Sequence, residues 1–278
     1  MSISDKFSDG IKKLKKLWLL PIVMLILDLG NLFLYEWIFK ISYTPTYKFF
    51  IFKLGIIDTP PSIRYIFEDF PNIILNYNSQ YGFTGIIDSF TLFNTLFLLS
   101  YALVASFLLA GYLSCLEGAD FENKISIKHF FVKGNELWFK FFMLNLITIA
   151  PIVLCLLEKS FLLLSFIFII FYYVKFSIVV DKGRLRENFS KGVQFFACHI
   201  GLSIKMVLFC GFIYAFVSFP VFYLGALGKP GIIIAMVIVY YIGMAMNMMV
   251  LEVYRQSDNK EEIVTLKENG GREVGEKG

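Results

Sequence analysis

The sequence has few of the residues that enzymes commonly use for catalysis or metal binding. It contains two histidines, His129 and His199, without the H-x-x-x-H or H-E-x-x-H spacing that would place both on one metal ion. It also lacks the G-x-S-x-G and phosphate-binding loop patterns. We therefore predict no enzymatic activity, no catalytic residue, no metal ligand and no cofactor.

Cysteine and charge are also scarce. The four cysteines form no C-x-x-C pair, and all lie in or at the ends of apolar stretches: Cys115, Cys155, Cys198 and Cys210. We expect buried thiols, without a disulfide framework or a zinc site. Charged residues make up 17% of the chain and the formal net charge is +4, a balance that does not indicate nucleic-acid binding.

Apolar residues dominate the 278-residue chain. They account for 57% of it, and the mean hydropathy is +0.68, which is too apolar for an ordinary soluble domain. A helix needs about 20 apolar residues to cross about 30 Å of hydrocarbon, and six stretches approach that length: 18–39, 91–115, 139–157, 161–180, 199–224 and 231–252. We predict an all-α polytopic membrane protein, with six transmembrane helices in three hairpins forming one domain at residues 1–254.

The placement of Lys and Arg predicts the orientation. Of 26 such residues, 18 lie in 1–17, 116–140, 181–198 and the tail after 252, and six lie in the alternate loops. By the positive-inside rule, both termini of this multi-pass cell-membrane protein are cytoplasmic. The polar residues 255–278 are expected to form a mostly disordered tail.

Three segments on the predicted cytoplasmic side share one pattern. Each has Phe, two residues and then Gly on the apolar face of an amphipathic helix, with a charge just before the Gly: Phe7 to Gly10, Phe131 to Gly134 and Phe189 to Gly192. Each precedes an outward span. The spacing predicts three interfacial amphipathic helices, one for each hairpin.

The external loop at 41–90 is long and rich in aromatic residues. Ile63, Ile66, Phe67 and Phe70 fall on one helical face, which predicts a short interfacial helix ended by Pro71. The loop is either a lid over an external cavity or an insertion that covers helix ends, and we favour the second.

Ionisable residues inside the spans define a candidate intramembrane polar site. Asp28 and Asn31 lie three residues apart near the predicted midplane, where an Asp costs about 2.5–3.5 kcal/mol. Lys175 and Lys205 lie about 9 Å from the cytoplasmic ends of their spans. These four residues predict either a transport site or a structurally paired Asp with lysines that extend to the interface.

One stretch resembles a known family. Val179-Val180-Asp181, followed by Asn188-Phe189-Ser190-Lys191-Gly192 and a further apolar run, is similar to the membrane domain of glycerophosphoryl diester phosphodiesterases and to related six-helix membrane proteins of unknown function. The resemblance implies a six-helix layout. Phosphodiesterase activity in that family belongs to a separate soluble barrel, for which this chain has no room.

Two functional hypotheses follow. The first is a non-catalytic membrane module that binds a partner protein or membrane lipids through basic clusters such as Lys12, Lys13, Lys15 and Lys16. The alternative is a small-solute or ion transporter that uses Asp28. The first accounts for the three repeated segments, and we prefer it.

Overall fold

The structure is a computed structural model that describes residues 2–53, 55, 59–72, 76–78, 82–84, 91–119, 126–157 and 171–273. The backbone alone is described at 76–78, 82–84, 149–157 and 258–273. Within these ranges the regular secondary structure is helical apart from one short antiparallel strand pair, which confirms the predicted all-α class.

The longest stretch of chain between the described helices lies between α2 and α3, and residues 158–170, between α4 and α6, lie outside the described residues. In order the elements are α1 (Ile3–Lys13), η1 (Leu14–Lys16), α2 (Leu19–Phe39), η2 (Ile63–Tyr65), β1 (Asn76–Asn78), β2 (Gly82–Thr84), α3 (Leu92–Gly118), α4 (Ile127–Leu157), α6 (Val174–Val180), α7 (Leu185–Cys198), α8 (Ile200–Gly225) and α9 (Lys229–Glu273).

Four helices in the described ranges are long and apolar enough to cross a membrane: α2, α3, α8 and residues Lys229–Ser257 of α9. A multi-pass membrane protein is therefore supported. The predicted stretch 139–157 lies in α4, whereas 161–180 begins outside the described residues and ends in α6. Six spans stay a prediction.

The amphipathic helix predicted around Phe131 to Gly134 is not separate from the following span, because α4 continues from Ile127 to Leu157 without interruption. Nothing near Trp138 breaks a helix, so the amphipathic and apolar parts join. One other expectation also changes: Cys198 is exposed, although Cys115 and Cys210 are buried as expected. The helix α9 continues through residue 254, and the division into a domain at 1–254 and a tail stays a prediction.

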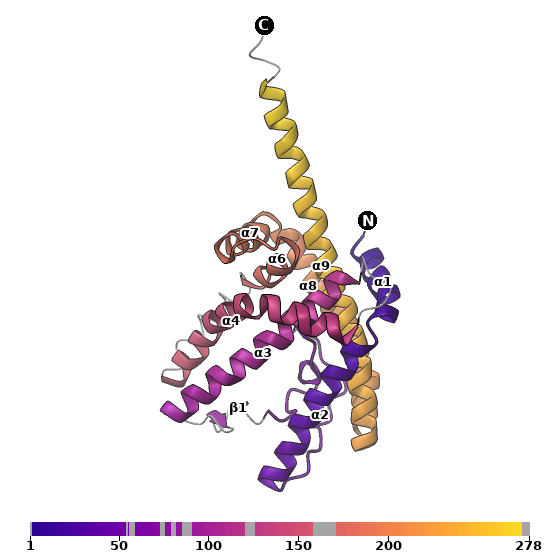
Figure 1. Cartoon of the computed structure of the whole chain (residues 1–278). Coiled ribbons are helices and arrows are strands. Elements are labelled where there is room, and N and C mark those ends of the chain that lie inside the picture. The colour runs from indigo at the N-terminus through magenta and orange to yellow at the C-terminus, as the bar shows by residue number, and fades with distance from the viewer. Residues whose placement is uncertain are drawn as a thin grey trace.

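Three helices form the centre of the bundle. α3, α6 and α9 contact one another pairwise, while α4 packs along α3 and α8 along α9. The C-terminal ends of α3 and α6 meet the middle of α9 through the ion pairs of Glu117 with Lys182 and Arg255, at 3.8 Å each. We call this end of the bundle the inner end. Figure 1 shows α9 as the longest helix, with α1 beside it and α7 near the same end.

Residues 59–72 of the long loop enter the bundle. We call them the inserted segment. Ile63, Ile66, Phe67 and Phe70 are at most 2% exposed, and only Ile63–Tyr65 forms a 3₁₀ turn. The predicted interfacial helix is therefore wrong: its apolar face packs inside the protein. Figure 1 shows the chain between α2 and α3 running among the helices.

Candidate functional site

Asp28 is the point at which the inserted segment is held. Nine residues after the start of α2, it lies about 14 Å along the helix. Its Oδ2 accepts hydrogen bonds from Ser62 Oγ at 3.1 Å, the Ile63 N–H at 3.3 Å and Tyr240 OH on α9 at 2.6 Å. Three donors thus compensate for the loss of water around this carboxylate.

The other predicted site residues do not all gather at Asp28. Asn31, one turn further on, donates from Nδ2 to the Pro71 carbonyl at 2.5 Å, so α2 holds both ends of the inserted segment. Lys175 lies over the Tyr172 ring, 4.2 Å from its centroid. Lys205 is exposed on α8, as expected for a lysine that extends to the interface.

A second polar contact joins the inserted segment to the central helices. Thr59 Oγ1 donates to Asn247 Oδ1 on α9 at 3.0 Å, and Asn247 Nδ2 donates to Tyr112 OH on α3 at 3.0 Å. Asn247 follows Tyr240 by seven residues, which places both on one face of α9 about 10 Å apart. Polar groups on that face therefore meet the segment at two depths.

Two glycines make room for the inserted segment. A Cβ at Gly243 of α9 would overlap Pro61 Cβ, and one at Gly225 of α8 would lie 2.7 Å from the Phe67 ring. Any larger residue at Gly243 would push against a rigid proline ring. The helices thus lack side chains where the segment passes. This space and the hydrogen bonds at Asp28 together hold the segment in place.

The three predicted amphipathic segments pack in the same way at the inner end. Each glycine allows close contact with a central helix: Gly10 of α1 with the Ala245 carbonyl of α9, Gly134 of α4 with Phe107 of α3, and Gly192 of α7 with the Val174 backbone of α6. In each case a Cβ would come within 2.7–3.3 Å of its neighbour. The segments of α4 and α7 each pack on the central helix that precedes them in the chain, whereas α1 packs on α9.

The phenylalanine of each segment packs against another ring. Ring centroids are 5.6 Å apart for Phe7 and Phe209, 5.8 Å for Phe131 and Phe107, and 5.3 Å for Phe189 and Phe171. Phe131 is still 55% exposed. The bundle therefore occupies part of the apolar face of each segment, less of it for α4, where Ile127 is also 57% exposed.

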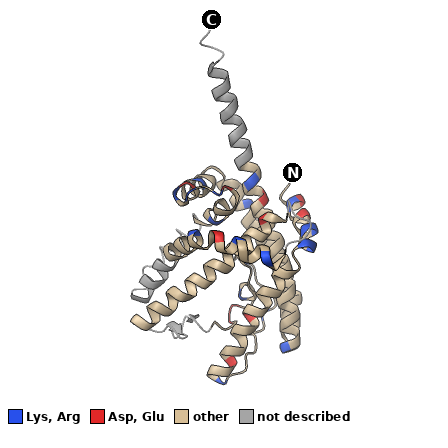
Figure 2. Ribbon diagram, viewed as in Figure 1, with Lys and Arg blue, Asp and Glu red and all other residues tan. Residues whose placement is uncertain are grey.

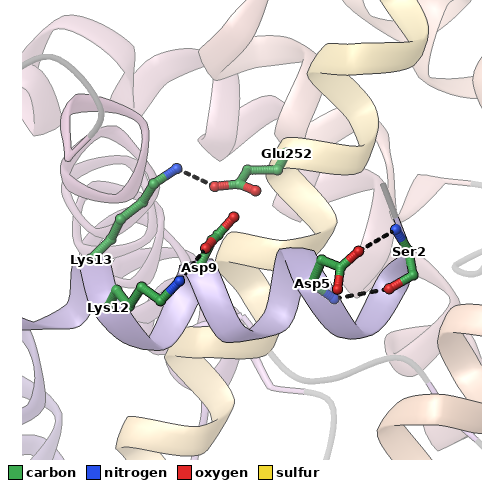
Figure 3. A network of polar contacts seen from close by, with 6 residues as sticks. All are labelled: Ser2, Asp5, Asp9, Lys12, Lys13 and Glu252. Atoms are coloured by element: carbon green, nitrogen blue, oxygen red, sulfur yellow. Dashed lines mark hydrogen bonds and ion pairs between the residues drawn. The ribbon is translucent and has the colours of Figure 1, made fainter.

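An ion pair fastens α1 to the bundle, as Figure 3 shows. Lys13 pairs with Glu252 of α9, whose side chain is 9% exposed. Lys12 pairs with Asp9 of α1 itself, at 2.9 Å on the outer face. At the start of the helix, Ser2 and Asp5 form a capping box, and the hydrogen bonds from the Ser2 backbone and hydroxyl hold the pKa of Asp5 below its usual value.

Asp181 has the same fastening role for α7. Its carboxylate accepts from Lys191 of α7 at 2.7 Å, Ser177 of α6 at 2.5 Å and Tyr254 of α9 at 2.8 Å. Burial raises the pKa of Asp181, but the hydrogen bonds from Lys191, Ser177 and Tyr254 outweigh it and leave the pKa below the usual value. The ionised carboxylate therefore links three helices.

Basic side chains remain on the outer faces of these segments. Figure 2 shows Lys and Arg gathered around α1, α7 and the neighbouring helix ends. Seven are exposed: Lys12, Lys15, Lys128, Lys182, Arg184, Arg186 and Lys191, the last of which pairs with Asp181. The exposed carboxylates among them accept hydrogen bonds, Glu136 from Lys133 and Glu187 from the Arg184 N–H. The inner end therefore presents positive charge.

No protein family, curated protein or solved structure matches this chain. Its resemblance to the membrane domain of glycerophosphoryl diester phosphodiesterases therefore stays a prediction. Among the described residues, no three His, Cys, Asp or Glu side chains are placed to share a metal ion. The function must be argued from the geometry alone.

Sequence reasoning identified Asp28 and the three glycines, but it missed Ser62, Tyr240 and Asn247 as partners of the inserted segment. A signal was present in the loop, because a stretch with several prolines and four apolar residues at helical spacing is unusual for an external connection. The same pattern fits the membrane interface and the protein interior, so it could not indicate the partner.

Proposed function

We propose that the chain is a non-catalytic membrane module that binds anionic lipid headgroups through the outer faces of its three amphipathic segments. The observation that carries the proposal is that each segment packs part of its apolar side on the bundle and leaves its basic side outward. Gly10, Gly134 and Gly192 turn the apolar sides toward α9, α3 and α6. The outer faces carry the exposed basic side chains and are available to a ligand.

Charge complementarity supports a lipid ligand. An anionic leaflet attracts Lys and Arg near its surface by about 1 kcal/mol each, so several such residues together provide useful affinity without a deep pocket. Lys12 contributes less because Asp9 already pairs with it. By the positive-inside rule, we also propose that the inner end is cytoplasmic.

Native mass spectrometry of the full chain tests this proposal. The protein would be purified from mixed phosphatidylcholine and phosphatidylglycerol, and the retained lipids counted. We expect Arg184→Gln/Arg186→Gln to retain fewer anionic lipids than the wild type. The matched control is Lys40→Gln/Lys229→Gln, which removes two exposed charges at the opposite end of the bundle, after α2 and at the start of α9.

The control is expected to retain as many anionic lipids as the wild type. Equal retention by both double variants would reject lipid binding at the inner end. If both double variants lose the same amount of anionic lipid relative to the wild type, the attraction is general to the charge of the protein. This result also contradicts the proposed surface.

A further inference from the structure

The inserted segment places irregular backbone at the depth of the membrane-spanning helices. Irregular backbone at membrane depth occurs where it is enclosed by protein or lines a water-filled path, since lipid offers no hydrogen bonds. Residues 59–72 are enclosed by α2, α8 and α9, through Asp28, Gly225 and Gly243 respectively. Thr59 also reaches Asn247, deeper in the bundle.

The segment brings a positive charge to Asp28. Arg64 interacts favourably with the Asp28 carboxylate through its charge, and its Nε is buried without a hydrogen-bond partner among the described residues. The positive charge of Arg64 thus lies within electrostatic range of Asp28. Arg64 acts as a cation that is tethered to the chain.

Withdrawal of the segment would leave a defined set of groups behind. Asp28 would lose Ser62, the Ile63 N–H and the charge of Arg64, while Tyr240 would remain beside it. Further inward, Asn247 and Tyr112 would remain on α9 and α3. The Asp28 carboxylate with the Tyr240 hydroxyl beside it is a site of one negative charge, which suits a monovalent cation, since sites for divalent ions usually gather more carboxylates and carbonyls.

We propose that residues 59–72 are a displaceable plug, and that its withdrawal opens a site for a monovalent cation at Asp28 and a path inward past Asn247. In the closed state the plug supplies its own cation, Arg64, and its own donors. In the open state Na⁺ or K⁺ replaces them. The closed structure is then the resting state of a gated cation pathway.

Gly243 gives a way to open the plug without touching the cation site. In Gly243→Leu the new side chain overlaps Pro61 and pushes the segment outward. The matched control is Gly201→Leu on α8, where a Cβ would meet nothing within 4 Å. Each full-length variant would be reconstituted in liposomes, and Na⁺ and K⁺ uptake measured with entrapped indicators.

We expect Gly243→Leu to raise cation uptake over Gly201→Leu by at least about tenfold, the population change that a loss of about 1.4 kcal/mol in plug binding produces. Adding Asp28→Asn should return uptake to the control level. Plug position is followed independently by labelling of Ser62→Cys with an impermeant thiol reagent, located by peptide mass spectrometry. Labelling should be faster in the Gly243→Leu background.

Faster labelling without increased uptake would overturn the cation pathway, and uptake that survives Asp28→Asn would overturn its site. Unchanged labelling in a folded Gly243→Leu protein would overturn the displaceable plug. If Gly243→Leu does not fold, Thr59→Val/Ser62→Ala removes the plug's side-chain bonds to Asn247 and Asp28, and the same uptake outcomes decide the proposal.

Discussion

Tyr240 donates a 2.6 Å hydrogen bond to Asp28 although 212 residues separate them along the chain. The bond connects the first long helix to the last, and the inserted segment lies against the same carboxylate through Ser62. It thus joins three parts of the sequence at one atom, Oδ2 of Asp28. Several properties of the protein depend on this arrangement.

Tyr240→Phe should destabilise the protein. The ring volume is kept, but the buried Asp28 carboxylate loses its shortest hydrogen bond, and bonds to charged groups contribute about 1.5–3 kcal/mol. Thermal unfolding in detergent would measure the effect. Tyr241→Phe is the matched control, since Tyr241 is 37% exposed, and it should unfold like the wild type. Identical transitions for both variants would contradict the role of Asp28 as an anchor.

Gly10→Leu should detach α1. A side chain at this position meets the Ala245 carbonyl, 2.9 Å from the Cβ, and backbone of a packed helix cannot move aside easily. Limited proteolysis should therefore cut within α1 faster than in the wild type. Gly30→Leu on α2, where a Cβ has no neighbour within 4 Å, should leave the cleavage rate unchanged. Equal cleavage of the two variants would mean that α1 does not need close contact with α9.

Lys13→Met should cost more stability than Lys12→Met. Removing Lys13 leaves the nearly buried Glu252 without that partner, and losing one member of a buried pair costs about 3–5 kcal/mol, an upper limit here because Lys13 is partly exposed. Lys12 pairs with Asp9 at the surface, where such pairs contribute about 0–1 kcal/mol. Denaturation in the same detergent compares the two. A larger loss of stability from Lys12→Met would contradict the larger contribution expected from the pair of Lys13 and Glu252.

Acid should loosen α7 first. The folded-state pKa of Asp181 lies below its usual value of 3.8, so the stabilisation by its ionised form is fully present above that value and is lost as pH falls through the lower folded-state pKa. Hydrogen exchange of α7 amides should accelerate over this acidic range. In Asp181→Asn, exchange should be faster at neutral pH and should change less on acidification. A wild-type profile in that variant would exclude Asp181 as the group responsible.

The spanning helices could be predicted because apolar length is a local property of the sequence. Each of α2, α3, α8 and α9 contains the expected uninterrupted stretch. The three glycines were also recognisable, since Gly10, Gly134 and Gly192 recur at one place in a periodic pattern. Their contact partners could not be predicted, because the sequences of the short segments do not indicate that they pack against α9, α3 and α6.

The inserted segment shows where sequence reasoning reaches its limit. Ile63, Ile66, Phe67 and Phe70 indicate an apolar face, but lipid and protein interior satisfy such a face equally well. The choice depends on Asp28, which gains donors only if the segment enters the bundle. A contact between distant residues determined the outcome, and the local pattern could not show it.

The packing of α1 on α9 has a consequence for biosynthesis. The surface that receives Gly10 includes Ala245 and Met248, which belong to α9 and leave the ribosome long after α1. Until then α1 has no docking place and waits beside the growing bundle. A chain that stops before α9 would keep α1 undocked, and the exposed helix would make such an incomplete chain open to proteolysis.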